Sequence, residues 1–207
     1  EPALFPMLAN KYNERKKDIV FPCYVQPKLD GVRAHYSEEA HKLTSRHNKI
    51  FRQDFDNLRD ELEAYSKNGE ILDGELYTKK IPFEELAGLC NRERWTEEVE
   101  YMEFHLFDIA DDRDFEDRFA KKEFQSQGKI KVVRTELVDN EEEAKVALKA
   151  AEHDNIGWCP LRLNYCVKDC VCFFAAKIDP FGSSTTSKFR LQKARCDNAM
   201  FSGYRET

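Results

Sequence analysis

Apolar residues recur along this chain at two spacings, one typical of strands and one typical of helices. Short alternating or continuous apolar runs predict strands over 21–27, 32–36, 43–46, 71–77, 102–109 and 130–137. Apolar residues three and four positions apart predict helices over 54–66 (stopped by Asn68-Gly69), 82–89, 114–125 and 140–153. Because several strands follow one another directly, the pattern favours one continuous α+β domain over a parallel doubly wound sheet.

The composition is that of a globular chain with a sizeable core. It has 207 residues, of which 41% are hydrophobic and 35% charged, and no repeat or Pro-rich linker divides it. No apolar run approaches the about 18 residues of a membrane span, so we expect no membrane association. Residues 1–6 lack the basic and apolar regions of a secretory signal. We therefore expect an intracellular protein, cytoplasmic or nuclear and of cellular or viral origin, that is not secreted.

The net charge and the cysteines bear on the possible ligands and on the compartment of the protein. A formal net charge of −6 argues against a chain that clamps a polyphosphate backbone over its whole surface, although it permits a local basic cleft. Four of the seven cysteines crowd together at Cys159, Cys166, Cys170 and Cys172. Their spacing is not Cys-x2-Cys, so we expect free thiols in a reducing compartment, with a zinc site as the alternative.

One lysine stands out by its setting. Lys28 follows a predicted strand and Pro27, and it precedes Asp30-Gly31. An Asp-Gly step suits a tight turn, because glycine tolerates positive φ without steric cost. We expect Lys28 to end a strand and point into the cleft that the strand borders. The alternative is a hairpin turn that carries a solvated lysine.

Further segments supply the side chains that would make such a lysine a nucleophile toward phosphorus. A lysine attacks only as a neutral amine, which burial or neighbouring cations favour, and arginines or lysines can also hold a triphosphate. A carboxylate is needed for a metal that bridges phosphate oxygens, and an aromatic face suits a purine. The chain has candidates for each role: Arg33, Arg46, Lys193 and Arg195 as cations, Glu75 as the carboxylate, and Phe107 as the aromatic face.

The order of these segments resembles that of a known family. Residues 28–33, Lys-Leu-Asp-Gly-Val-Arg, match the Lys-x-Asp-Gly-x-Arg motif of the covalent nucleotidyltransferases. Segments 43–48, 72–76, 104–108 and 193–195 then follow in the family's order. Within the superfamily, the chain looks like the ATP-dependent DNA ligases, from about Pro6 to Gly203.

The resemblance implies a fold and a role for each matching residue. The fold would be an α+β nucleotidyltransferase domain, ATP-grasp-like, of antiparallel sheets flanked by helices with a cleft between them. Lys28 would take AMP from ATP as a phosphoramidate. The other roles would be nucleotide binding by Gln26 and Arg33, contact with the nucleotide and substrate phosphate by Arg46, contact with the ribose or a metal-bound water by Glu75, adenine stacking by Phe107, and contact with the α-phosphate by Lys193 and Arg195.

The same resemblance implies the cofactors and partners. ATP and Mg²⁺ would serve the reaction, with Glu75 as the metal-side residue. The substrate would be nicked duplex DNA, as in replication, repair and recombination, and we expect a monomer. Residues 1–207 would form the adenylation domain, and the oligonucleotide-binding domain of the family would lie outside this chain.

The chain also departs from the family pattern, and the departures define the alternatives. Ile156 occupies the position of a glutamate that helps to hold the metal, and the spacing from Gly157 to Arg162 is one residue longer. Arg195 replaces the second lysine of Lys-x-Lys, with a different donor geometry. One alternative is an RNA ligase or a GTP-using mRNA capping enzyme of the same superfamily. The other is an inactive nucleotide- or DNA-binding module with a ligase-like scaffold.

Overall fold

The computed structural model covers the sheets and most of the connections between them. It describes residues 4–5, 10–11, 17, 19–66, 69–111, 113–153, 161–167, 170–177, 188–193 and 205–206, with side chains between residues 17 and 150. Predictions that concern Asn68, the Ile156 segment, Cys159 and Arg195 lie outside these residues. Within the described part of the chain, no helix has both the length and the apolar character to cross a membrane.

The first sheet carries most of the predicted strands. Its five strands lie in the order β5 (Lys42–Ser45), β4 (Val32–Ser37), β6 (Ile71–Tyr77), β7 (Glu103–Ile109) and β8 (Ile130–Val132). Neighbours in this sheet are antiparallel, except that β8 runs parallel to β7. The predicted strands at 32–36, 43–46, 71–77 and 102–109 are confirmed, with bounds that differ by no more than one residue.

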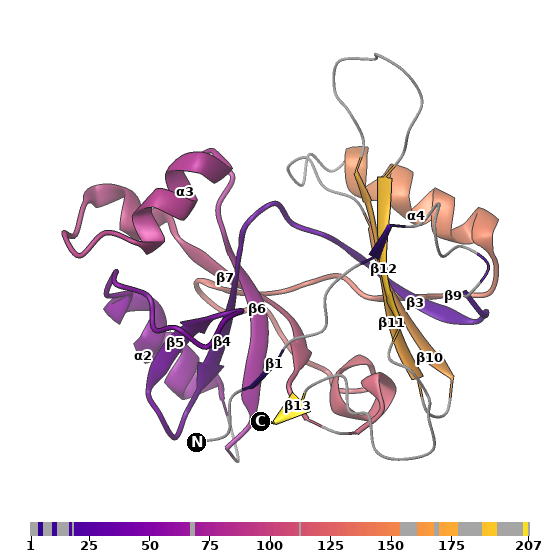
Figure 1. Cartoon of the computed structure of the whole chain (residues 1–207), viewed down its shortest axis with the longest axis horizontal. Helices are drawn as coiled ribbons and strands as arrows, with labels where there is room; N and C mark the ends of the chain where they lie inside the picture. The colour runs from indigo at the N-terminus through magenta and orange to yellow at the C-terminus, as the bar shows by residue number, and fades with distance from the viewer. Residues whose placement is uncertain are drawn as a thin grey trace.

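A second sheet of six strands stands beside the first, as Figure 1 shows. Its order is β12 (Lys188–Lys193), β2 (Asn10–Lys11), β11 (Cys170–Lys177), β10 (Leu161–Val167), β3 (Cys23–Pro27) and β9 (Glu136–Val138). All pairs are antiparallel except that of β2 with β11. A short pair of β1 (Leu4–Phe5) with β13 (Arg205–Glu206) lies apart. The predicted α+β class with antiparallel sheets flanked by helices is confirmed.

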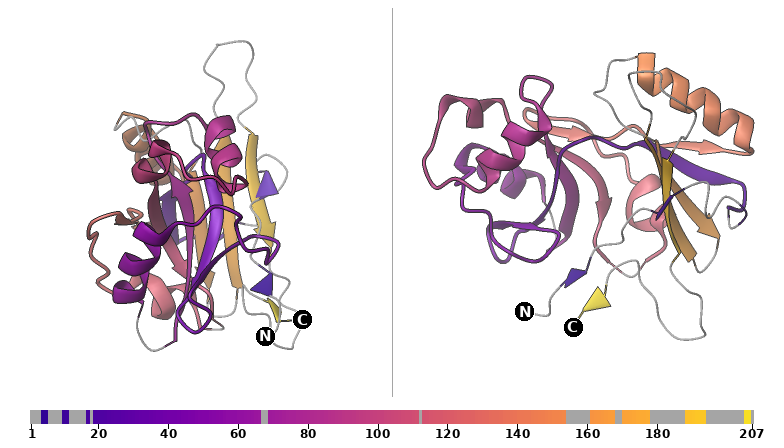
Figure 2. Two further views of the ribbon diagram at one scale, coloured as in Figure 1. Left: turned by 90° about the vertical axis from the view of Figure 1, so that its left-hand side faces the viewer. Right: turned by 45° about the horizontal axis from the view of Figure 1, so that its top comes forward.

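The helices cover the outer faces of the two sheets (Figure 1, Figure 2). Helices α2 (Asp56–Tyr65) and α3 (Phe83–Cys90) lie on the first sheet, and α4 (Glu141–His153) packs on β3 and β9. A 3₁₀ segment, η2 (Glu97–Tyr101), leads into β7. Asn140 caps α4, because its Oδ1 accepts from the Glu143 N–H at 3.0 Å while its side-chain amide donates to the Glu143 carboxylate at 2.9 Å.

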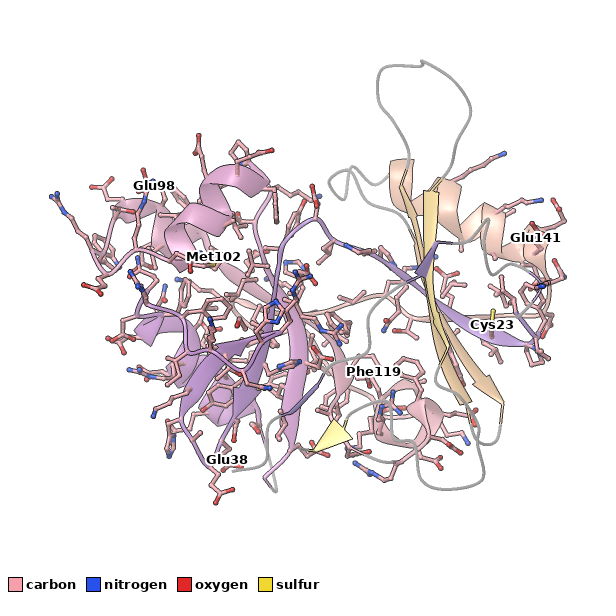
Figure 3. All side chains as sticks on the ribbon, in the orientation of Figure 1. Cys23, Glu38, Glu98, Met102, Phe119 and Glu141 are labelled. Carbon is pink, nitrogen blue, oxygen red and sulfur yellow. The ribbon has the colours of Figure 1, made fainter. Side chains whose placement is uncertain are left out.

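The helix predicted over 114–125 is wrong in length. Only the π-helical turn η3 (Glu116–Ala120) forms there. Its aromatic side chains turn inward and stack in series, with ring centroids 5.6 Å apart for Phe115 and Phe119 and 5.3 Å apart for Phe119 and Phe124. Figure 3 shows Phe119 between the two sheets. Packing against the core, rather than helical periodicity, therefore sets the path of this segment.

The strand predicted over 130–137 is also wrong, because the run changes sheets. Residues 130–132 form β8 on the first sheet, and residues 136–138 form β9 on the second. The Val133 N–H donates to the Leu106 carbonyl at 2.8 Å and ends the contact with β7. A single continuous apolar run can contribute strands to two different sheets, so the apolar pattern alone could not separate β8 from β9.

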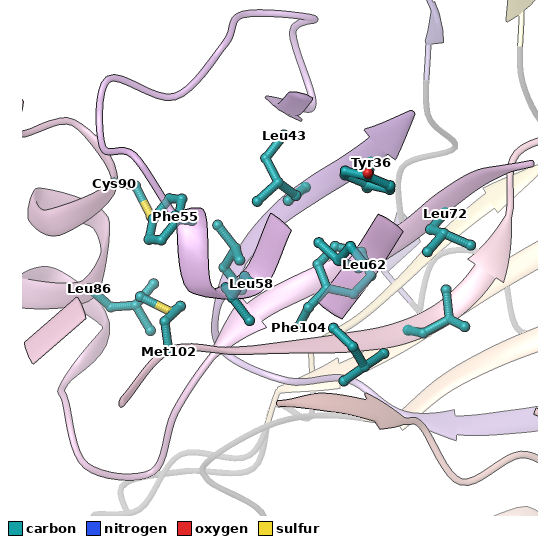
Figure 4. Packing of buried hydrophobic residues seen from close by; sticks show 14 of the residues in the cluster. Tyr36, Leu43, Phe55, Leu58, Leu62, Leu72, Leu86, Cys90, Met102 and Phe104 are labelled. Atoms are coloured by element: carbon teal, nitrogen blue, oxygen red, sulfur yellow. The ribbon is translucent and has the colours of Figure 1, made fainter. Parts of the chain in front are cut away.

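The main core lies between the first sheet and helices α2 and α3. Alternate residues of β4 and β6, such as Tyr36 and Leu72, are fully buried and meet Leu58 and Leu62 of α2. Figure 4 shows these side chains packed with others from the same face. Since alternate positions face opposite sides of a sheet, the residues between them are left to face the second sheet.

A glycine in β6 tests how tightly this core is packed. A Cβ on Gly74 would lie 2.6 Å from ring atoms of Phe104 and 2.7 Å from the His105 carbonyl oxygen. We expect Gly74→Ala to lower the free energy of unfolding by about 1–3 kcal/mol, because overpacking displaces a buried ring. Urea unfolding monitored by circular dichroism measures the change.

Gly88 provides the matched control. It lies in α3, and a Cβ there would meet only the far end of the Arg92 side chain at 3.8 Å. Gly88→Ala should stabilise the protein by about 0.5–1 kcal/mol through helix propensity. Equal effects of the two substitutions would contradict the packing described for Gly74.

Candidate active site

Lys28 lies where the chain passes from one sheet to the other. β3 belongs to the six-stranded sheet and β4 to the five-stranded sheet, so residues 28–31 form a crossing and not a hairpin. The hairpin alternative is therefore wrong. Lys28 is half-buried, and its Nζ donates to the Leu29 carbonyl at 3.4 Å. Leu29 is buried beside it, while Asp30 is exposed.

Gly31 fixes the height of this crossing above β6. A Cβ on Gly31 would lie 2.7 Å from Cγ of Glu75 and would collide with the Leu76 carbonyl oxygen. Its φ lies outside the left-handed region, so the expected use of positive φ in this turn is wrong. The glycine is required because the backbone comes too close to β6 to leave room for a side chain. Glu75 therefore lies beside Gly31, three residues after Lys28 in the chain.

The face of the first sheet opposite the main core carries an unusual set of polar residues. Arg33 and His35 come from β4, and Asp73 and Glu75 come from β6. In register, Arg33 pairs with Glu75, and His35 pairs with Asp73. All four are largely buried, so this face is an internal polar layer at the side where the second sheet stands (Figure 1).

A β-bulge in β7 places two consecutive residues on this polar face. Asp73 pairs with Asp108, and Gly74 pairs with Leu106, so Phe107 has no partner of its own on β6. Such a bulge re-aims a side chain without ending the strand. As a result Phe107 and Asp108 both join the layer of Arg33 and Asp73.

Arg33 and Asp73 form a buried ion pair in this layer. Arg33 Nε donates to Asp73 Oδ1 at 2.9 Å, and its Nη2 binds Oδ2. Burial alone would raise the pKa of the Asp73 carboxyl, but the charge of Arg33 and a contact from His35 outweigh it and hold that pKa well below its usual value. The guanidinium also lies 5.2 Å from the centroid of the Phe107 ring. Arg33 is therefore fixed between a carboxylate and an aromatic face.

A second ion pair of similar geometry lies behind the first. Arg118 of η3 donates through Nε and Nη2 to the two oxygens of Asp108, at 2.8 Å each. Both side chains are almost fully buried. Burial, followed by the neighbouring charge of Asp73, raises the pKa of Asp108, while Arg118 opposes the rise. This pair ties η3 to the end of β7.

Glu75 and Phe107 both lie near residues of the Lys28 crossing, and both are enclosed. Glu75 is 5% exposed and lies beside Gly31. Phe107 is 3% exposed and packs with Leu29 and Val133. Contact of Glu75 with a ribose and stacking of Phe107 on adenine stay predictions. The structure brings both residues to the Lys28 crossing.

Gln26, predicted to bind the nucleotide, has a structural contact that sequence reasoning missed. Its side-chain amide is fully buried, and Nε2 donates to the Phe107 carbonyl at 2.8 Å and to Thr135 Oγ1 at 2.9 Å. These bonds join β3 of the second sheet to the bulge of the first. Its side chain thus fixes the distance between the strand that leads to Lys28 and the strand that carries Phe107.

Arg46 lies on the surface at the same end of the first sheet. It follows β5 in a turn closed by the Asn48 N–H, which donates to the Ser45 carbonyl at 2.9 Å. Ser45 pairs with Ala34, so Arg46 stands one position further along, level with Arg33. The side chain is exposed, and its Nε donates to His47 at 3.0 Å. Arg46 is placed to meet a ligand that approaches from solvent.

The register does not bring Lys193 to Lys28. Gln26 shares a row of the second sheet with Arg162 and Arg190, whereas Lys193 pairs with Cys172, three positions further along β12. Lys193 therefore lies toward the Cys23 end of β3, away from the crossing. A contact of Lys193 or Arg195 with the α-phosphate stays a prediction.

The cysteines and carboxylates of the described residues form no metal centre. Cys23 and Cys90 are free and buried, and burial raises the pKa of each thiol to about 12. No group of three or more His, Cys, Asp or Glu side chains in the described part of the chain is arranged to hold an ion. The crowded cysteines of the sequence have no described side chains, so the zinc alternative is not tested.

Comparison with solved structures identifies the fold as that of a ligase nucleotidyltransferase domain. A Lig E DNA ligase, from work on DNA binding with a minimal scaffold, matches with a TM-score of 0.60 and 21% identity, over 91% of this chain and 68% of that one. The ligase domain of M. tuberculosis LigD matches with a TM-score of 0.53 and 16% identity, over 86% and 69%. A structure designated Pmar-Lig_Pre matches with a TM-score of 0.61 and 17% identity over 86% of this chain, which spans 54% of its length.

The sequence itself matches the ATP-dependent DNA ligase domain over residues 6–156. This is more than half of the chain, and the chain belongs to this family. No curated protein matches it.

The buried pair of Asp73 and Arg33 makes a prediction about stability. The pKa of Asp73 in the fold lies below its unfolded value of about 3.9, so the carboxylate contributes stability above that pH and loses it as the pH falls further. We expect Asp73→Asn to lower the free energy of unfolding at pH 7 by about 3–5 kcal/mol, because a buried guanidinium is left unpaired. The deficit should shrink as the pH is lowered below about 4.

Chemical unfolding at several pH values measures this difference. Asp54→Asn is the control, since Asp54 forms an exposed pair with Arg59 and should change stability by no more than about 1 kcal/mol. A deficit for Asp73→Asn that stays constant from pH 7 to pH 3 would contradict the depressed pKa.

Proposed function

We propose that this chain is the adenylation domain of a ligase that seals nicks in duplex DNA through a lysyl-AMP intermediate on Lys28. Membership of the ATP-dependent DNA ligase family supports the reaction class. The observation that carries the proposal is the close packing of Gly31, three residues after Lys28, on Glu75 of β6, whose strand partner Arg33 lies against Phe107.

The proposed reaction has three steps: adenylation of Lys28, transfer of the AMP to the nick, and closure of the nick. The neutral amine of Lys28 forms an N–P bond to the α-phosphorus of ATP, the bond to the β-phosphate oxygen breaks, and pyrophosphate leaves while the amine proton passes to solvent. A 5′-phosphate oxygen of the nick then takes the AMP, and the N–P bond breaks. A 3′-hydroxyl finally attacks that 5′-phosphorus and releases AMP.

The cations around Lys28 would stabilise the charge that develops on the phosphate oxygens. Arg33 is fixed at the site, and Arg46 lies exposed beside it, where a DNA phosphate can reach it. Preorganised donors of this kind give a large part of the rate in phosphoryl transfer.

The residues of the site fit a magnesium ion that arrives with ATP. Asp73 and Asp108 are each engaged by a guanidinium, and Glu75, the carboxylate that the family resemblance assigns to the metal side, lies beside Gly31 at the Lys28 crossing. Mg²⁺ binds through one or two carboxylates together with substrate phosphates, which agrees with a single protein ligand. When bound, the ion would neutralise negative charge on the phosphates. Glu75, beside the crossing, is the residue of this chain that would hold it.

Incubation of the purified chain with labelled ATP, followed by a denaturing gel, tests the first step. We expect a covalent label that Lys28→Ala abolishes, and a mass increase of one AMP on intact protein. Lys145→Ala, which changes an exposed lysine of α4, should leave the label unchanged. Absence of label from the folded chain with ATP and Mg²⁺ would favour the inactive binding module.

The nucleotide and the nucleic acid separate the remaining alternatives. A label from GTP in place of ATP would point to a capping enzyme. Transfer of the AMP to a nicked RNA duplex but not to a nicked DNA duplex would point to an RNA ligase. We expect label from ATP and transfer to the 5′-phosphate of nicked DNA.

A further inference from the structure

His35 is a buried histidine whose role is not explained by the site described so far. It is 2% exposed, and neither ring nitrogen has a hydrogen-bond partner of good geometry among the described residues. An apolar side chain would fill this position without burying two polar nitrogens. The contact that His35 does make is with Asp73: its Nε2 lies 3.2 Å from Asp73 Oδ1.

That contact falls on the oxygen that also holds Arg33. Asp73 Oδ1 accepts from Arg33 Nε at 2.9 Å, and the same oxygen faces His35 Nε2. Arg33 and His35 lie two positions apart on β4. An ionised carboxylate only accepts hydrogen bonds, so this contact is favourable when Nε2 carries the proton. In that tautomer, His35 would set a second N–H beside the carboxylate oxygen that orients the guanidinium.

The neighbouring ion pair shows what such a second donor does. Arg118 binds Asp108 with the same two-point geometry, and Asp108 Oδ1 also accepts from the Ile109 backbone N–H at 2.8 Å. The carboxylate of that pair is therefore anchored by the strand itself. For Asp73, the side chain of His35 lies beside the corresponding oxygen, Oδ1.

We propose that His35 is a positioning residue that acts through Asp73 to hold the guanidinium of Arg33 against Phe107, in the orientation that the phosphates of ATP require. The statement about the phosphates of ATP rests on the function proposed above. The statement that His35 holds Arg33 against Phe107 concerns the free protein alone. Loss of His35 would remove one of the groups that face Asp73 Oδ1, the oxygen to which Arg33 Nε donates at 2.9 Å.

The geometry is tested on the full chain by ¹⁵N–¹H spectra of the arginine Nε–H groups. Comparison with Arg33→Lys and Arg118→Lys assigns the two buried signals. In His35→Phe, which fills the position without a donor, we expect the Arg33 Nε–H to exchange with solvent at least about tenfold faster, with Arg118 unchanged. In His35→Gln, which keeps an N–H donor, both rates should stay close to those of the wild type. Equal exchange of Arg33 in the wild type and in His35→Phe overturns the proposal.

The wild-type protein provides a test that no folding failure can obscure. The ¹⁵N shifts of the His35 ring report which nitrogen carries the proton, and the proposal requires it on Nε2. A neutral ring protonated on Nδ1 alone would overturn it. His35→Leu carries the exchange measurement if the phenylalanine variant does not fold.

The consequence for the reaction is measured separately. Formation of the Lys28 adduct with ATP should slow by about tenfold in His35→Phe, mainly in the rate constant at saturating ATP, and His35→Gln should recover most of it. If the wild-type chain forms no adduct, the proposed function fails, while the exchange rates still decide whether His35 positions Arg33. Faster exchange with an unchanged rate of adduct formation would overturn the catalytic part alone.

Discussion

The close packing of Gly31 on β6 determines where the chain passes from one sheet to the other. The backbone there approaches Glu75 so closely that any Cβ would collide. This contact sets the height of Lys28 above the first sheet, and the rest of the polar layer is arranged around it. Without the contact, the motif lysine and the residues of β4 and β6 would belong to two separate surfaces.

Charge burial is the second constraint on the site. Two Arg–Asp pairs lie side by side in the interior, and each carboxylate would be costly to bury alone. Such pairs contribute little net stability compared with apolar packing, but they fix geometry strongly. Here they fix Arg33 of β4 and Arg118 of η3 against carboxylates of β6 and β7. The two aspartates of this polar face therefore serve the structure of the layer.

Much of this could be predicted from the sequence, because local patterns govern strands and motifs. The apolar pattern predicted β4 and β6, and the motif at 28–33 predicted that Lys28 lies at the end of a strand. What depends on tertiary pairing could not be predicted in the same way. The run at 130–137 divides between sheets, the bulge at Phe107 joins strands more than thirty residues apart, and the bonds of Gln26 reach partners 81 and 109 residues away. Asp73 lies in the motif at 72–76, but its role in the fold comes from Arg33 and His35.

The bond from Gln26 to the Phe107 carbonyl also has a mechanical consequence. It joins the two sheets within two residues of Lys28, and the crossings at 28–31 and 133–135 lie at the same junction. A rotation of one sheet against the other that kept these bonds would therefore pivot at this point. Displacements grow with distance from a pivot, so the outer edges of the sheets would move further than Gln26 and Phe107.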